Sequence, residues 1–193
     1  DIPTRIGGYS PKNFDEAYAG AVPAATALYR SLNVPAVRML QEYGLEKFYH
    51  TLGKLELSTL NHPASHYGLS IILGGSEVTL WEVTGIYAGM ARALKHFRDY
   101  QSHYDPGDYH HPIYIRQQVD DQQVEYRENG IFSAASLWYT FEALTQLNRP
   151  RQESGWRLLG SSRKVAWKTG TSFGFRDGWA IGVTPDYAIG VWT

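Results

Sequence analysis

The residue types best suited to chemistry form the run Lys168-Thr169-Gly170-Thr171-Ser172. We expect this run at the end of a β-strand, because the residues before it are rich in Val and Trp. On a strand, the hydroxyls of Thr169 and Thr171 point to one face and can hold a carboxylate, with the Lys168 ammonium behind them. Gly170 allows another backbone to approach closely. The run therefore predicts a binding site for the carboxylate of a peptide, although a Lys-Thr-Gly tripeptide also occurs by chance in ordinary strands.

The surrounding sequence predicts helices followed by strands, which is typical of the α+β class. Helical periodicity after proline or serine predicts helices over 23–31, 34–44, 45–52, 76–94 and 133–147, the fourth capped by Ser76. Runs rich in Val, Ile, Trp and Tyr predict an antiparallel meander over 164–168, 178–183 and 187–192. We also expect a buried segment over 67–75 and a small hairpin starting at 113–119. The result would be an antiparallel sheet packed with helices. The start at Asp1 without a leader pattern and the last expected strand, which stops at Thr193, lead us to expect a domain truncated at both ends.

The composition excludes several classes of function. The 193 residues suffice for one domain, and 18 Lys and Arg balance 19 Asp and Glu, so the chain lacks the basic surface of a nucleic-acid-binding protein. The absence of cysteine excludes disulfides, thiolate zinc sites and thiol nucleophiles. The sequence has no run of about 18 apolar residues that could span a membrane. We expect no cofactor and no metal.

A second group of polar residues, Ser31-Leu32-Asn33, lies upstream between two of the expected helices. A serine-x-asparagine element followed by a Lys-Thr-Gly strand resembles the transpeptidase domain of class A penicillin-binding proteins, in particular their 1C subgroup. The resemblance is carried by residues 9–15, 20, 27–37, 67–70, 73–75, 166–172 and 176–177. It implies a single partial transpeptidase domain over residues 1–193, in which residues 96–130 match poorly and form a variable insertion.

The resemblance implies a β-lactamase/transpeptidase-like fold and a D,D-transpeptidase activity. In that reaction a serine is acylated by the D-alanyl-D-alanine end of a peptidoglycan stem peptide, and β-lactams acylate the same serine. Ser31 is then the hydroxyl that relays a proton to the leaving nitrogen. Asn33 is the amide that orients the substrate and the catalytic lysine, and Lys168 supplies positive potential.

The strand run takes the substrate-binding roles in this resemblance. Thr169 and Thr171 hold the terminal carboxylate of the substrate, and Gly170 keeps the strand approachable. The backbone N–H of Thr171 forms half of an oxyanion hole, a device whose loss lowers the rate by about 10²–10³-fold.

The nucleophile of this family lies in an S-x-x-K motif, which we expect upstream of Asp1. The only such string in the chain is Ser161-Ser162-Arg163-Lys164. This string leads into an expected strand, where residues three positions apart point to opposite faces, whereas the motif needs a helix that places its serine and lysine on one face. We therefore interpret it as a polar segment that precedes the strand. The isolated chain is therefore expected to be inactive.

Other polar and aromatic groups are expected to be structural. His62 and His66 are four residues apart, but Pro63 argues against a helix that carries both, and His110-His111 lack a carboxylate at ligand spacing. The aromatic group Trp138, Tyr139 and Phe141 is expected in the core.

Three functions remain open at this point. The first is part of a peptidoglycan-crosslinking domain at the periplasmic face of the bacterial inner membrane, in a longer protein with a membrane anchor and a glycosyltransferase domain. Its partners would be stem peptides and β-lactams. The second is a non-catalytic peptide- or glycan-binding module that keeps only the carboxylate grip, and the third is a β-lactam sensor of the same fold.

Overall fold

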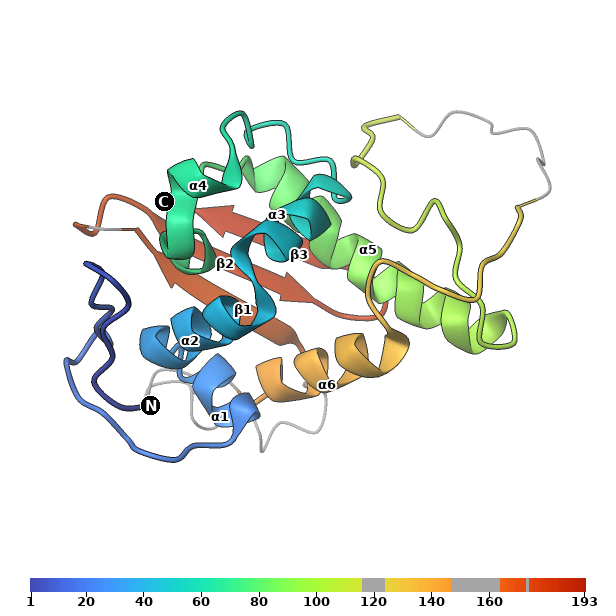
Figure 1. Ribbon diagram of the computed structural model, residues 1–193. Coiled ribbons are helices and arrows are strands. Elements are labelled where there is room, and N and C mark those ends of the chain that lie inside the picture. Colours follow the sequence, from blue (N-terminus) through green and yellow to red (C-terminus); the bar gives the residue numbers. More distant parts are fainter. Residues whose placement is uncertain (116–123, 147–163, 173) are drawn as a thin grey trace.

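The computed structural model describes residues 1–115, 124–146, 164–172 and 174–193. All its helices precede its strands, so the α+β order is confirmed (Figure 1). The helices are α1 (Ala24–Tyr29), α2 (Asn33–Tyr43), α3 (Leu45–Gly53), α4 (Ala64–Tyr67), the 3-10 helix η1 (Gly68–Leu73), α5 (Leu80–Asp99) and α6 (Ala134–Leu144). The strands are β1 (Ala166–Thr171), β2 (Gly178–Val183) and β3 (Ala188–Trp192).

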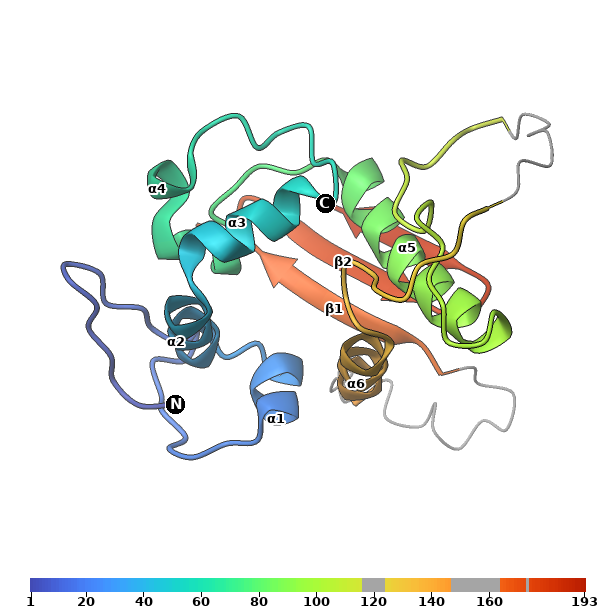
Figure 2. The same ribbon diagram turned by 45° about the vertical axis from the view of Figure 1, so that its right-hand side comes forward.

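The three strands form an antiparallel sheet in the order β1-β2-β3, which confirms the predicted meander. β1 starts later than predicted and runs through Thr171, so the polar run forms the end of the strand, as expected. Lys168 pairs with Ile181, which pairs with Gly190, and these three positions share one face of the sheet. Helices α5 and α6 cover this face (Figure 2).

The core lies between these two helices and the sheet. Leu144, Ala166 and Val183 are buried there, and Tyr87 of α5 and Phe141 of α6 pack against them. Burying apolar area against the sheet is the main term that holds the two layers together. A side chain at Gly190 would collide with Thr84 of α5, so this helix approaches the sheet backbone closely.

Helix α6 starts as predicted, because the Ser133 hydroxyl accepts a hydrogen bond from the Ser136 N–H at 3.1 Å. The expectation that its aromatic residues all lie in the core is wrong for two of them. Trp138 and Tyr139 are exposed and pack on each other edge to face, while Phe141 faces the core.

Helix α5 starts at Leu80, so the predicted cap at Ser76 is wrong. Thr79 and Glu82 form a capping box: the Thr79 hydroxyl accepts from the Glu82 N–H at 3.1 Å, and the Glu82 carboxylate accepts from the Thr79 N–H at 3.4 Å and the Thr79 hydroxyl at 2.7 Å. The other carboxylate oxygen accepts from the Ser58 N–H at 2.9 Å. Burial raises the pKa of Glu82, but these hydrogen bonds outweigh it and lower the pKa to about 2.

Two other local predictions need correction. The segment 67–75 that we expected to be buried is mostly half-buried: it forms the end of α4 and η1, and among its residues only Ile71 is buried. Ile113 and Ile115 are exposed and belong to no strand, so the described part of the predicted 113–119 hairpin does not form. The rest of that prediction, residues 116–119, lies outside the described residues.

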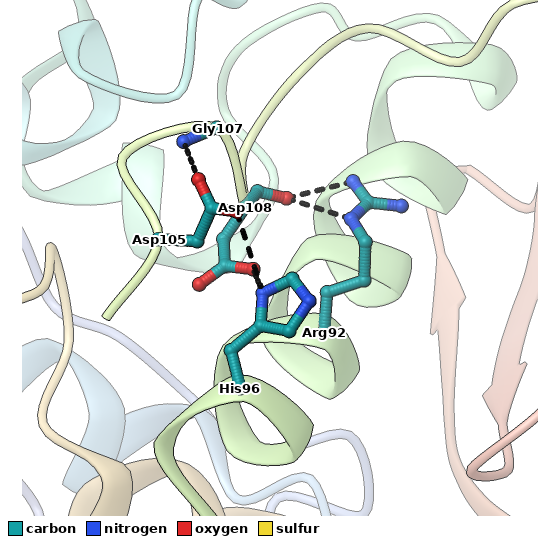
Figure 3. A network of polar contacts seen from close by, with 5 residues as sticks. All are labelled: Arg92, His96, Asp105, Gly107 and Asp108. Carbon is teal, nitrogen blue, oxygen red and sulfur yellow. Dashed lines mark hydrogen bonds and ion pairs between the residues drawn. The ribbon is translucent and has the colours of Figure 1, made fainter. Parts of the chain in front are cut away.

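A segment from Tyr104 to Pro112, here called the strap, lies along α5. Gly85 and Gly89 of α5 make room for it, because a side chain at Gly89 would lie 2.9 Å from the Asp108 carbonyl. A network of polar contacts binds the strap to α5 (Figure 3). Arg92 donates two hydrogen bonds to the Asp108 carbonyl, at 3.0 and 2.7 Å, and His96 Nδ1 lies 2.7 Å from Asp108 Oδ1. Burial raises the pKa of Asp108, and the nearby His96 opposes this.

Among the helices that the structure describes, none is long and apolar enough to cross a membrane.

The Glu82 carboxylate predicts a pH-dependent stability. Glu82→Gln should lower the free energy of unfolding at pH 7 by about 1–3 kcal/mol, because the ionised acceptor of several hydrogen bonds is lost. Since the folded pKa of about 2 lies below the ordinary glutamate value of 4.5, this stabilisation is present above pH 4.5 and disappears as the pH falls toward 2. Urea unfolding at several pH values measures the difference.

The exposed Glu77, two residues before the cap, provides the control. Glu77→Gln should change the free energy of unfolding by less than about 0.5 kcal/mol at every pH. An equal effect of both substitutions would contradict the role assigned to Glu82.

Candidate active site

Ser31 lies at the turn between α1 and α2 and has a positive φ of 55°. The Ser31 N–H donates to Leu28 O at 3.0 Å and the Leu32 N–H donates to Ala27 O at 2.9 Å, which is the hydrogen-bond pattern of a Schellman motif. Glycine usually occupies this left-handed position, so a serine here is uncommon. Leu32 is buried and Ser31 is exposed, so the turn presents the hydroxyl at the surface.

The start of α2 is held by residues that are remote in sequence. Asn13 is only 3% exposed, and its Oδ1 accepts from the Val34 N–H at 3.2 Å, although no side chain caps the helix from its own N-cap position. The Asn13 amide donates to the Asp1 carboxylate, at 3.0 and 3.1 Å, and to Ala17 O at 2.8 Å. Asn33 Nδ2 donates to Lys12 O at 2.9 Å. These bonds fix the segment 12–14 against the turn that carries Ser31.

Asn13 is a positioning residue that the sequence argument did not single out. It lies within the segment 9–15 that carried the family resemblance, but nothing in the local sequence indicates that its amide caps α2. That hydrogen bond spans 21 positions of the chain.

The fold brings Lys168 to Ser31, which lies 137 positions away in the chain. Lys168 shares the helix-covered face of the sheet with Ile181, and its Nζ donates to Ser31 Oγ and, at 2.5 Å, to Thr169 O. Burial lowers the pKa of Lys168, because the ammonium is partly removed from water. The next residues of β1, Thr169, Gly170 and Thr171, are exposed.

β1 is an edge strand of the described sheet, and its backbone orientation follows from its pairing. The Ser172 N–H donates to Asp177 O at 3.1 Å, toward β2. Since alternate residues of a strand turn their N–H groups to opposite sides, the N–H groups of Thr169 and Thr171 point away from β2. On that side the described residues contribute no strand, so these two groups line the edge.

The remaining candidates do not form sites. The rings of His62 and His66 stack with centroids 4.2 Å apart. Pro63 is the N-cap of α4, so the helix contains His66 but not His62. Among the described residues, no group of three or more His, Cys, Asp or Glu side chains could hold a metal ion. Residues 161–163 of the S-x-x-K string lie outside the described part of the chain.

The chain is similar to several known proteins in sequence and fold. No protein-family model matches the chain. The chain is 35% identical over 193 residues to penicillin-binding protein 1C of Escherichia coli K12, a match that covers all of this chain and 22% of the relative. It is 30% identical over 192 residues to penicillin-binding protein 1B of Vibrio cholerae, covering 95% of this chain and 22% of the relative.

The chain belongs to the class A penicillin-binding proteins. It spans about a fifth of the length of these curated relatives.

Solved penicillin-binding proteins share the fold. The PonA1 protein of Mycobacterium tuberculosis, solved in complex with penicillin V, superposes with a TM-score of 0.69 at 21% identity over 98% of this chain and 52% of that chain. Penicillin-binding protein 1A of Haemophilus influenzae gives a TM-score of 0.63 at 18% identity over 94% of this chain and 31% of that chain. The predicted β-lactamase/transpeptidase-like fold class is therefore confirmed.

The role of Asn13 in this penicillin-binding protein segment can be tested directly. Asn13→Ala should lower the free energy of unfolding by about 2 kcal/mol or more. The substitution removes the hydrogen-bond acceptor of the buried Val34 N–H and the donor to Asp1 and Ala17, and these groups then lack a partner. Urea unfolding measures this loss, and amide hydrogen exchange at Val34 should become faster. Asn61→Ala, at an exposed asparagine, is the matched control and should change neither quantity appreciably.

Proposed function

We propose that this chain forms the substrate-binding part of a peptidoglycan D,D-transpeptidase. The observation that carries the proposal is the hydrogen bond between Lys168 and Ser31 beside the exposed edge of β1. It joins the Lys-Thr-Gly and serine-x-asparagine elements, which are far apart in the sequence. The natural substrates would be stem peptides, with β-lactams acting on the same site.

The edge of β1 suits an extended peptide. An edge strand offers unpaired backbone groups that can add a strand, and Thr169 and Thr171 turn their N–H groups to this edge. Their hydroxyls lie on one face of β1 and the Lys168 ammonium lies on the other. A carboxylate placed at the edge can therefore reach hydroxyls and a positive charge together, and the Thr171 N–H is available to a developing oxyanion.

The direction of the hydrogen bond supports a proton relay. Lys168 donates to Ser31 Oγ, which leaves the Ser31 O–H proton free to point toward a leaving nitrogen. When Ser31 gives that proton to the nitrogen, it takes one from Lys168, so the lysine becomes neutral. The lowered pKa of Lys168 favours this transfer. Asn33, whose amide nitrogen donates to Lys12, lies two residues further on and would orient the substrate.

The acylated serine would come from a part of the longer protein outside these 193 residues. The relatives are about four to five times longer than the matched segment, which leaves room for it, and also for a membrane anchor and a glycosyltransferase domain. The protein would act at the periplasmic face of the bacterial inner membrane, in the cell envelope, where peptidoglycan is cross-linked.

The test is acylation of the full-length protein by a fluorescent penicillin. Thr169→Val and Thr171→Val should each lower the second-order rate of acylation by about tenfold or more, because a hydroxyl that holds the carboxylate is lost. Thr171→Ser keeps the hydroxyl and should retain most of the rate. Intact mass spectrometry of the isolated chain should show no adduct.

Two results would count against the proposal. Reversible penicillin binding without acylation of the full-length protein would favour a non-catalytic binding module. A covalent adduct on any serine of the isolated chain would show that the nucleophile lies within these residues.

A further inference from the structure

The backbone of Thr171 is positioned by its neighbours in the sheet. Thr171 pairs with Gly178, and both the N–H and the carbonyl of Thr171 point away from β2, as in a non-hydrogen-bonded pair of an antiparallel ladder. The pairs on either side must therefore set where its N–H lies. The next residue, Ser172, is bonded to Asp177, so this pair determines the geometry on the turn side of Thr171.

A side chain completes the bonding between Ser172 and Asp177. The Ser172 N–H donates to Asp177 O at 3.1 Å, as in a regular antiparallel pair. The Asp177 N–H donates to Ser172 Oγ at 2.9 Å, where a regular pair would use the backbone carbonyl. The Ser172 carbonyl accepts instead from the Phe175 N–H at 3.1 Å. The Ser172 hydroxyl thus closes the turn directly after Thr171.

The carboxylate of Asp177 is held by a residue of β3. Trp192 Nε1 donates to Asp177 Oδ1 at 3.0 Å, and a hydrogen bond to an ionised acceptor is stronger than one between neutral groups. Trp192 is 55% exposed, so burial alone does not fix its indole. Backbone hydrogen bonds between Gly178 and Thr193, at 2.9 and 3.0 Å, extend the pairing of β2 and β3 next to this contact.

These contacts connect β3 to β1, although β2 separates the two strands. Trp192 binds the side chain of Asp177, and the backbone of Asp177 binds Ser172 through two hydrogen bonds. Ser172 follows Thr171 directly in the chain. A donor that stabilises a developing oxyanion must be held at one place before the reaction, because a small displacement lowers the rate steeply.

We propose that Trp192 and Asp177 are positioning residues that act through Ser172 to hold the backbone N–H of Thr171 at the edge of β1. This inference rests on the proposed function, in which that N–H stabilises the oxyanion. The two side chains need not touch the substrate. They affect the rate of the chemical step and not the binding of the substrate carboxylate, which the hydroxyls of Thr169 and Thr171 provide.

The test is the reaction of the full-length protein with benzylpenicillin at several concentrations. Its time courses give the dissociation constant of the noncovalent complex and, separately, the rate constant of acylation within that complex. Trp192→Phe and Asp177→Ala should each lower the rate constant by about 3- to 10-fold, a part of the 10²–10³-fold loss that follows removal of an oxyanion donor. The dissociation constant should stay within about twofold.

A conservative variant and a control in the other turn separate positioning from stability. Asp177→Asn keeps an oxygen that can accept from the Trp192 indole, so it should retain at least about half of the rate constant. In the turn between β2 and β3, the Thr184 hydroxyl accepts from the N–H groups of Asp186 and Tyr187 at 3.3 and 3.0 Å. Thr184→Val weakens this other turn and should change neither constant by more than about twofold.

The outcomes distinguish this inference from the proposed function. An unchanged acylation rate constant in Trp192→Phe and Asp177→Ala overturns the inference, as does an equal loss in Thr184→Val. A rise in the dissociation constant that accounts for the whole loss of reactivity overturns it as well. In these cases the proposed function stands. Failure of benzylpenicillin to acylate the unmodified full-length protein overturns the proposed function, and this inference with it.

Discussion

The hydrogen bond between Lys168 and Ser31 is the contact on which the site depends. It joins the helical part of the chain to the sheet, and each partner is set by a different local device. A Schellman turn presents the Ser31 hydroxyl at the surface, and the pairing of β1 with β2 directs Lys168 to the helix-covered face. Because both devices are backbone hydrogen-bond patterns, the contact is organised before any ligand arrives.

The buried amide of Asn13 gives this arrangement its second support. A buried polar group without a hydrogen-bond partner lowers the stability of the fold. The four hydrogen bonds of the Asn13 side chain therefore favour a single arrangement of its partners. Its bond to the Val34 N–H replaces the helix cap that the local sequence does not supply. Together with the Asn33–Lys12 bond, it connects the N-terminal segment of the chain with the turn that carries Ser31.

Helix α5 supplies the rigid frame behind the sheet. Its capping box and the buried Glu82 define where it starts, and two glycines let the strap lie against its backbone. The strap falls within residues 96–130, which we expected to be a variable insertion, yet Arg92 and His96 of α5 bind its Asp108 through a specific network. The strap is therefore bound to the surface of α5 by specific side-chain hydrogen bonds.

Periodicity and motif spacing in the sequence sufficed for the α+β order, the strand meander, the Ser133 cap of α6 and the two motif elements. These features depend on neighbours in the chain, so local patterns carry them. The Ser76 prediction failed because a serine and a threonine compete three residues apart, and only Thr79 has a glutamate at the capping-box position. Tertiary structure alone decided that Trp138 and Tyr139 are exposed, that Asn13 caps α2, and that Lys168 meets Ser31. Each of these depends on which distant segments pack together, a choice made by the whole core and not by any one stretch of residues.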